Sequence, residues 1–132
     1  MRIEMEQVEG RRFKIKARGI DVIVDDTLEA GGPGDGFRPT ELLMGALATC
    51  MAGTMLTFAR NQEIPVGDIS VVAEDERADH PDRVGRIIVE MDVTADCTDK
   101  QKASLQRVAA ACTIHNTLER PPTIDVAFTV AR

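Results

Sequence analysis

Residues 39–61 read PTELLMGALATCMAGTMLTFARN, and this stretch decides how the chain folds. No residue from Leu42 to Ala59 is charged, and Pro39 suits the first turn of a helix. The uncharged run is near the lower limit of transmembrane length, but glycines, threonines and a cysteine interrupt it, and no other segment resembles it. We therefore predict the buried central helix of a domain and no membrane-spanning segment.

Short strands are predicted before this helix. Apolar and basic residues alternate over residues 12–18, and a valine and isoleucine stretch follows at 21–25, so the first 25 residues are expected to form a meander of strands. Residues 27–38 are rich in glycine and show no periodicity, which predicts a loop that leads into the helix.

A hairpin, two helical segments and a strand are predicted after the central helix. Two strands follow Pro65, Thr98 suits the cap of a second helix that runs to about Ala111, and a short helical piece ends before Pro121. Apolar and polar side chains alternate over residues 124–130, which predicts a last strand. This element order predicts an α+β fold in which helices lie against antiparallel sheet.

Composition limits the function classes. The 132 residues are 43% hydrophobic and 29% charged, which suits a single globular domain over residues 1–132. A net charge of −6 and an aromatic content of 3% argue against nucleic-acid binding, which uses basic surfaces and stacking side chains. The N-terminus has no apolar signal core, and three cysteines are an odd number. We therefore expect a cytoplasmic protein with reduced thiols rather than a disulfide framework.

The cysteines are the candidate reactive groups. Taken singly, Cys50 in the apolar helix and Cys112 after an alanine-rich segment are each typical of a buried core thiol, and Cys97 beside Asp96 is interpreted as incidental. Cys112 and His115 are spaced to share a metal ion on a helix, but there is no Cys-x-x-Cys and the other histidine is distant, so no metal is expected. No Gly-x-Ser-x-Gly motif of a serine hydrolase occurs, and no Gly-Lys-Ser/Thr of a phosphate-binding loop occurs. No cofactor is expected.

Two motifs taken together resemble a known family. The first, GFRPTELLMGALATC, ends at Cys50, and the second, CTIHNTL, begins at Cys112. Their sequences, their separation and their place in the predicted element order resemble the OsmC/Ohr family of osmotically induced and organic hydroperoxide resistance proteins, over nearly the whole chain. The resemblance implies antiparallel sheets wrapped around central helices, and an intertwined homodimer with its sites at the interface.

The resemblance also implies a thiol-dependent peroxidase. Cys50 would attack an organic hydroperoxide, Cys112 would resolve the sulfenic acid to a disulfide, and an external dithiol, such as a lipoyl-type reductant, would reduce that disulfide. In the family an arginine held by a glutamate stabilises the attacking thiolate. The matching residues here are Arg12 and Glu41, with Arg11 and Arg38 as alternative arginines.

Two departures from the family pattern bear on activity. In the hydroperoxide-resistance branch the glutamate occupies the position of Thr40, whereas Glu41 comes one position later, a rotation of about 100° on a helix. Thr113, Ile114 and His115 stand where the best-studied branches have Pro-Val-Ser. The alternative function is a non-catalytic small-molecule-binding or stress-response protein on the same fold.

Overall fold

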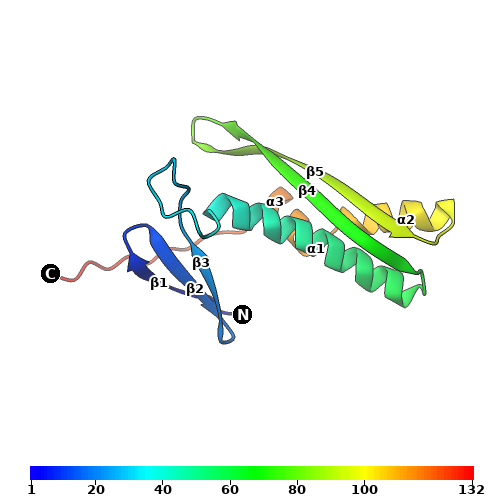
Figure 1. Cartoon of the computed structure of the whole chain (residues 1–132), viewed down its shortest axis with the longest axis horizontal. Coiled ribbons are helices and arrows are strands. Elements are labelled where there is room, and N and C mark those ends of the chain that lie inside the picture. The colour runs from blue at the N-terminus through cyan, green and yellow to red at the C-terminus, as the bar shows by residue number, and fades with distance from the viewer. The chain divides into compact units, whose positions relative to one another are not determined.

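The computed structural model describes residues 1–132 and has an α+β architecture (Figure 1). Its strands form a three-stranded sheet and a two-stranded sheet, and three helices follow or separate them in the chain. The chain divides into two compact units, of which the first contains residues 1–46 and 72–90 and the second contains residues 47–71 and 91–132. The predicted α+β class is confirmed.

An antiparallel meander of three strands forms the sheet of the first unit. The strands are β1 (Glu4–Glu9), β2 (Arg12–Ala17) and β3 (Ile20–Val24). Gly10 and Gly19 take φ angles of 55° and 79° in the two turns, a backbone conformation that residues other than glycine rarely adopt. In the central strand, Ile15 pairs with Met5 on one side and with Val22 on the other. The predicted N-terminal meander is confirmed.

The glycine-rich loop, residues 27–38, folds back to the end of β3. The N–H of Asp25 donates to the carbonyl oxygen of Phe37 at 3.0 Å. A Cβ atom at Gly36 would lie 2.9 Å from the carbonyl oxygen of Ile23, so this close approach requires glycine. The loop therefore packs against the sheet before the chain enters the long helix.

Helix α1, Pro39–Asn61, has the bounds that the sequence predicted. The carboxylate of Glu41 accepts the N–H of Arg38 at 2.7 Å and satisfies a donor at the start of the helix. The buried residues of α1 are Leu47, Met55 and Ala59, so the helix is less buried in this chain than predicted. By length and composition α1 could cross a membrane, a test that the core helix of a soluble protein also passes.

A hairpin and two shorter helices follow α1. They are β4 (Val66–Ala78), β5 (Arg83–Ala95), α2 (Asp99–Ala109) and α3 (Thr113–Glu119). A capping box begins α2, because Thr98 Oγ1 accepts the N–H of Gln101 at 3.2 Å while Gln101 Oε1 accepts the N–H of Thr98 at 2.9 Å. The predicted cap at Thr98 is confirmed, and α2 ends slightly before the predicted Ala111.

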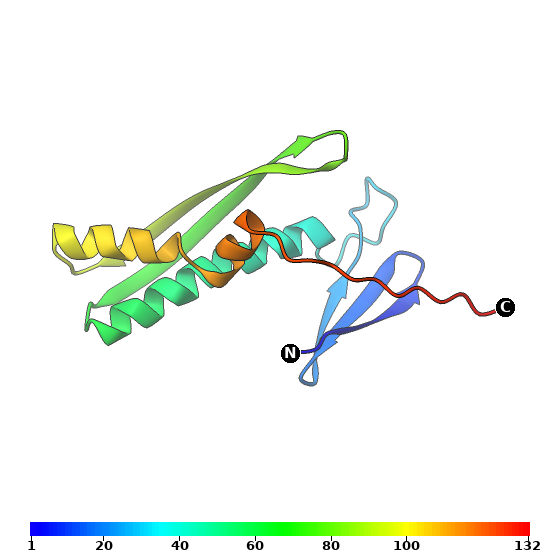
Figure 2. The ribbon, with the colours of Figure 1, turned by 180° about the vertical axis from the view of Figure 1, so that it is seen from behind.

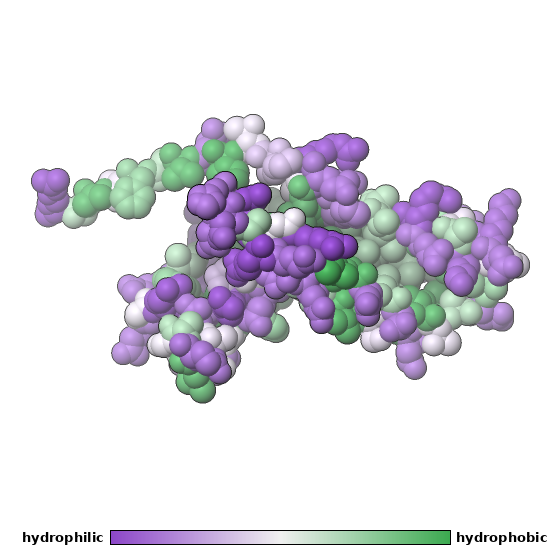
Figure 3. Space-filling view, turned by 90° about the horizontal axis from the view of Figure 1, so that it is seen from above, coloured by the Kyte–Doolittle hydropathy of each residue, from purple (hydrophilic) through white to green (hydrophobic).

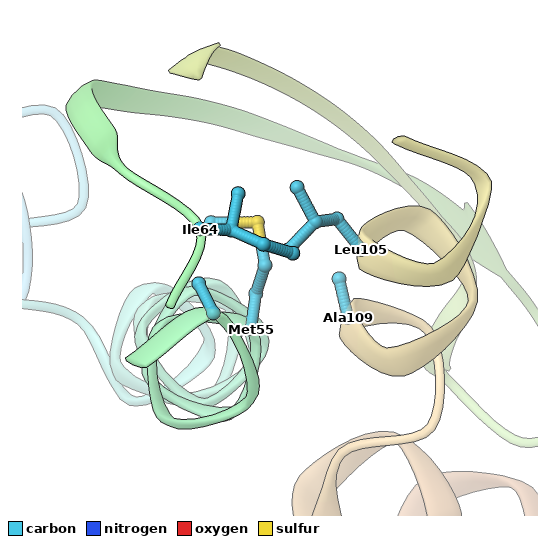
Figure 4. Packing of buried hydrophobic residues seen from close by; sticks show 5 residues of the cluster. Met55, Ile64, Leu105 and Ala109 are labelled. Atoms are coloured by element: carbon cyan, nitrogen blue, oxygen red, sulfur yellow. The ribbon is translucent and has the colours of Figure 1, made fainter. Parts of the chain in front are cut away.

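The core of the second unit lies between α1 and α2 (Figure 4). Met55 and Ala59 come from α1, Leu105 and Ala109 come from α2, and Ile64 comes from the connection after α1. Residues four positions apart lie on the same face of a helix, so each helix presents one large and one small side chain to the other. This packing fixes the part of α1 that follows Cys50.

The predicted last strand is wrong for the single chain. Residues 121–132 carry no helix or strand and belong to neither sheet (Figure 2). Ile124 and Val126 are each 80% exposed and Phe128 is 86% exposed, and the segment is a row of largely hydrophobic side chains at the left of Figure 3. A strand needs hydrogen bonds to the backbone of a neighbouring strand, and alternating side chains alone do not supply that neighbour.

Candidate redox site

Cys50 and Cys112 come together within the second unit. Cys50 lies in the middle of α1, and Cys112 is the residue that caps the N-terminus of α3. The two side chains lie close enough that each sulfur shifts the pKa of the other. The structure therefore brings the two predicted sulfur residues into direct contact.

Cys112 is a buried thiol. Its backbone angles, φ −76° and ψ 161°, are those of a helix cap, and its Sγ accepts the N–H of His115 at 3.4 Å in the role that a serine or threonine oxygen usually has. The residue is only 1% exposed. Burial raises the pKa of Cys112, the N–H of His115 opposes this shift, and Cys50 adds to it. Cys112 therefore keeps its proton at neutral pH.

Of the two cysteines, Cys50 is the one that more readily forms a thiolate. Its pKa is lowered, chiefly by a hydrogen bond from the backbone N–H of Ile114. Burial opposes this shift, whereas the side chains of Cys112 and Thr54 and the backbone N–H of Thr113 add to it. The first N–H groups of a helix have no acceptor within the helix and lie at the positive end of its dipole, so they are suited to stabilise an anion.

The backbone amides of Thr113 and Ile114 were not foreseen from the sequence, which pointed to an arginine. A signal was nevertheless present: Cys112 directly precedes the short helical piece expected before Pro121, at the position where a side chain meets the free amides of a first turn. What the sequence could not show is that Cys50, far away in the chain, reaches the same amides.

Arg12, the arginine carried over from the family, pairs with aspartates in the first unit. Its Nη1 lies 3.1 Å from Oδ2 of Asp25 and also contacts Asp35. Burial raises the pKa of Asp25, and the hydrogen bond from Arg12 lowers the pKa of Asp35. The two carboxylates therefore hold one guanidinium group between them.

The alternative arginines also have carboxylate partners in the first unit. Arg11 and Arg38 both pair with the buried Asp26, at 2.8 and 3.4 Å. Glu41 accepts the backbone N–H of Arg38, so its carboxylate serves the start of α1. The carboxylates that contact Arg12 in this unit are thus Asp25 and Asp35, which the sequence patterns did not single out.

His115 lies in the first turn of α3. Its Nε2 is 2.7 Å from Oε1 of Glu119, and its Nδ1 is buried without a hydrogen-bond partner. The structure contains no group of three or more histidine, cysteine or acidic side chains that could hold a metal ion. The pair of Cys112 and His115 therefore lacks the further ligands that a metal site needs.

A cavity of about 500 Å³ occupies the second unit beside the core. Met51, Met55 and Met91 line it together with Cys97, and the core cluster also packs against Cys97. Cys50 and Cys112 are not among its lining residues. Cys97 is therefore a half-buried packing residue at the edge of an apolar hollow.

The sequence profile of the OsmC-like protein family matches residues 32–127. The chain belongs to this family. The matched region contains Cys50 and Cys112 and most of the C-terminal segment. No curated protein is significantly similar to the chain in sequence.

Solved structures share the OsmC-like fold. A provisionally named osmotic stress induced and detoxification response protein from Psychrobacter arcticus 273-4 superposes with a TM-score of 0.79 at 22% identity, over 87% of this chain and 85% of that chain. An OsmC-like protein from Mycoplasma pneumoniae gives 0.77 at 19% identity, over 89% and 86%. The organic hydroperoxide resistance protein OhrB of Bacillus subtilis gives 0.61 at 20% identity, over 92% and 93%. The predicted OsmC-like fold is confirmed.

Proposed function

We propose that this OsmC-family protein is a thiol-dependent reductase of organic hydroperoxides, in which Cys50 attacks the peroxide and Cys112 resolves the product. The observation that carries the proposal is a pair of neighbouring thiols whose pKa values shift in opposite directions. A two-cysteine peroxidase needs this difference, because one sulfur must attack as a thiolate while the other waits as a thiol. The organic hydroperoxide resistance protein among the structural relatives supports the substrate class.

In the first step the Cys50 thiolate attacks an oxygen of the peroxide. The O–O bond breaks, the sulfur is oxidised to a sulfenic acid, and the alkoxide leaves as an alcohol after it takes up a proton. The amides of Ile114 and Thr113 keep Cys50 ionised at the start of this step. The thiolate therefore has a stabilising partner that does not depend on an arginine.

In the second step Cys112 attacks the sulfur of Cys50. The S–O bond of the sulfenic acid breaks, water leaves and a disulfide forms. The contact between the two side chains means that little rearrangement is needed to bring the sulfurs together. An external dithiol, for which a lipoyl-type compound is the proposed class, is oxidised to its own disulfide and returns both cysteines to thiols.

Arg12 and Glu41 complete the proposed catalytic set. From the resemblance to the family, we assign Arg12 the role of a second cationic partner that favours the attacking thiolate. Within its own unit its guanidinium group pairs with Asp25 and Asp35. Glu41 stabilises the first turn of the helix that carries Cys50, so its proposed role is positioning.

We also propose an intertwined homodimer that works in the cytoplasm, without nucleic-acid or membrane partners. The exposed apolar side chains of residues 124–130 and of Leu43 and Leu56 on α1 are surfaces that a second copy would cover. A further strand from another copy would also supply the hydrogen-bond partner that residues 124–130 lack.

Turnover with cumene hydroperoxide and dihydrolipoamide tests the proposal. The wild-type protein should consume the peroxide repeatedly, and Cys50→Ser should consume none. Cys112→Ser, treated with the peroxide before any dithiol is added, should stop at the sulfenic acid. Cys97→Ala is the matched control, because Cys97 lies outside the thiol pair, and it should retain activity. Failure of the wild-type protein to reduce organic hydroperoxide with any dithiol would refute the proposal.

A non-catalytic small-molecule-binding function has one observation in its favour, the methionine-lined cavity of about 500 Å³. Methionine side chains adapt to apolar ligands of varied shape. This alternative predicts that apolar ligands raise the melting temperature while organic hydroperoxide leaves Cys50 and Cys112 reduced.

A further inference from the structure

His115 has no role in the chemistry described so far, although it contacts one of the reacting sulfurs. Cys112 and His115 are the cap and the third residue of α3, and the backbone N–H of His115 donates to Cys112 Sγ at 3.4 Å. In a complete capping box the side chain of the third residue reaches back to the cap, as Gln101 does in α2. In α3 this second hydrogen bond is not made, and Nδ1 of His115 is buried without a partner.

Glu119 determines which nitrogen of His115 is free. Its Oε1 lies 2.7 Å from Nε2 of the imidazole, one turn further along α3. When the carboxylate accepts Nε2–H, the neutral ring has a lone pair on Nδ1. The His115 side chain is 32% exposed overall, whereas the Nδ1 atom itself is buried. A basic nitrogen thus lies inside the protein in the same helical turn as Cys112.

We propose that Nδ1 of His115 accepts the proton of Cys112 when this thiol attacks Cys50, with Glu119 as the positioning residue of the imidazole. The inference rests on the proposed pairing of Cys50 with Cys112. The S–H bond of Cys112 breaks, the S–S bond forms, and the S–O bond of the Cys50 sulfenic acid breaks. The oxygen leaves with its electron pair and takes the proton from the imidazolium as water. The Cys112 sulfur is oxidised, the Cys50 sulfur is reduced, and the imidazole returns to its neutral form.

The burial of Cys112 is the reason that a base is useful here. Burial raises the pKa of Cys112, so its thiolate is scarce at neutral pH. Imidazole is the side chain that ordinarily exchanges a proton between about pH 5 and 8, and a positioned general base accelerates proton transfer by about 10²–10⁴-fold. The titratable groups that face this site are Cys50 on α1, Cys112 at the cap and Glu119 on α3.

A thiol-exchange experiment tests the inference without peroxide. In a Cys97→Ala background, 5,5′-dithiobis(2-nitrobenzoate) should first form a mixed disulfide at Cys50 and release one coloured thiolate. Cys112 should then attack that disulfide and release a second thiolate, at a rate independent of reagent concentration. His115→Gln retains an amide donor toward Glu119 but removes the base, and His80→Gln makes the same change at the other histidine, in the turn after β4.

His115→Gln should leave the first phase unchanged and slow the second phase about tenfold or more at pH 7. The difference should disappear at alkaline pH, where Cys112 ionises by itself; a purely structural defect would not show this pH profile. His80→Gln should match the parent protein in both phases. An unchanged second phase in His115→Gln at all pH values, or the absence of a second phase in the parent, would overturn the inference. If the exchange behaves as expected but organic hydroperoxide does not oxidise Cys50, the peroxidase proposal fails and the role of His115 stands.

Discussion

Replacement of Ile114 by proline removes the hydrogen-bond donor that contributes most to the lowered pKa of Cys50. Proline has no backbone N–H, and the N–H groups of a helix's first turn are not used within the helix, so α3 loses none of its own hydrogen bonds at this position. The substitution therefore acts chiefly on the contact between α3 and Cys50.

The expected magnitude follows from the strength of such a contact. A hydrogen bond to a charged group contributes about 1.5–3 kcal/mol, and one pKa unit corresponds to about 1.4 kcal/mol. Cys50 is partly accessible, so water replaces some of the lost interaction and the lower end of the range applies. The pKa of Cys50 should rise by about one unit, and its alkylation at neutral pH should slow about tenfold.

The measurement is the pH dependence of iodoacetamide labelling at Cys50, resolved from Cys97 and Cys112 by peptide mass spectrometry. Thr113→Pro is the matched control, because it introduces proline one position earlier and removes the weaker of the two amide donors. It should shift the pKa of Cys50 less than Ile114→Pro does. If Ile114→Pro retains its circular dichroism spectrum and labels with the wild-type pH profile, the helix amides do not stabilise the thiolate.

Four further results are expected. Leu105→Ala, which opens a hole in the core of the second unit, should lower the free energy of unfolding in urea by about 2–5 kcal/mol, whereas an unchanged value would show that the core is elsewhere. Deletion of residues 121–132 should shift the protein toward monomer in sedimentation at micromolar concentration; a wild-type protein that is already monomeric would contradict the proposed dimer. Arg12→Ala should move the pH profile of Cys50 alkylation upward, and an unshifted profile would remove Arg12 from the proposed set. Burial raises the pKa of Cys112, so the stability that this thiol confers is fully present below its unfolded pKa and is lost as the pH rises through its folded pKa. Urea stability should therefore fall more steeply above about pH 8.5 in the wild type than in Cys112→Ser.

Local patterns predicted the elements whose signals are themselves local. Pro39 begins α1 and Thr98 caps α2 because both effects act within one helical turn. The alternation over residues 124–130 is a local signal for side-chain placement, but a strand also needs a neighbouring backbone, which the single chain does not provide. The strand prediction therefore failed, because the neighbouring strand that it requires lies outside the segment.

In the candidate site, too, the sequence predicted some groups and missed others. Cys50 and Cys112 were found from motifs and resemblance, and the structure brings them into contact. The donors from Ile114 and Thr113 are backbone groups, which leave no residue type to recognise, and the aspartates around Arg12 come from a loop whose path depends on tertiary contacts. Free Nδ1 of His115 could not be foreseen either, because the orientation of the ring depends on packing and on Glu119.

Peptide mapping of the fully reduced protein after one equivalent of cumene hydroperoxide tests the proposed peroxidase chemistry most directly. The digest should be analysed without reduction, after free thiols have been blocked. A thiol peroxidase of this kind predicts a single disulfide between Cys50 and Cys112 of one chain, with Cys97 recovered as a free, blocked thiol. Recovery of Cys50 and Cys112 as free thiols, or a disulfide that involves Cys97, would contradict it.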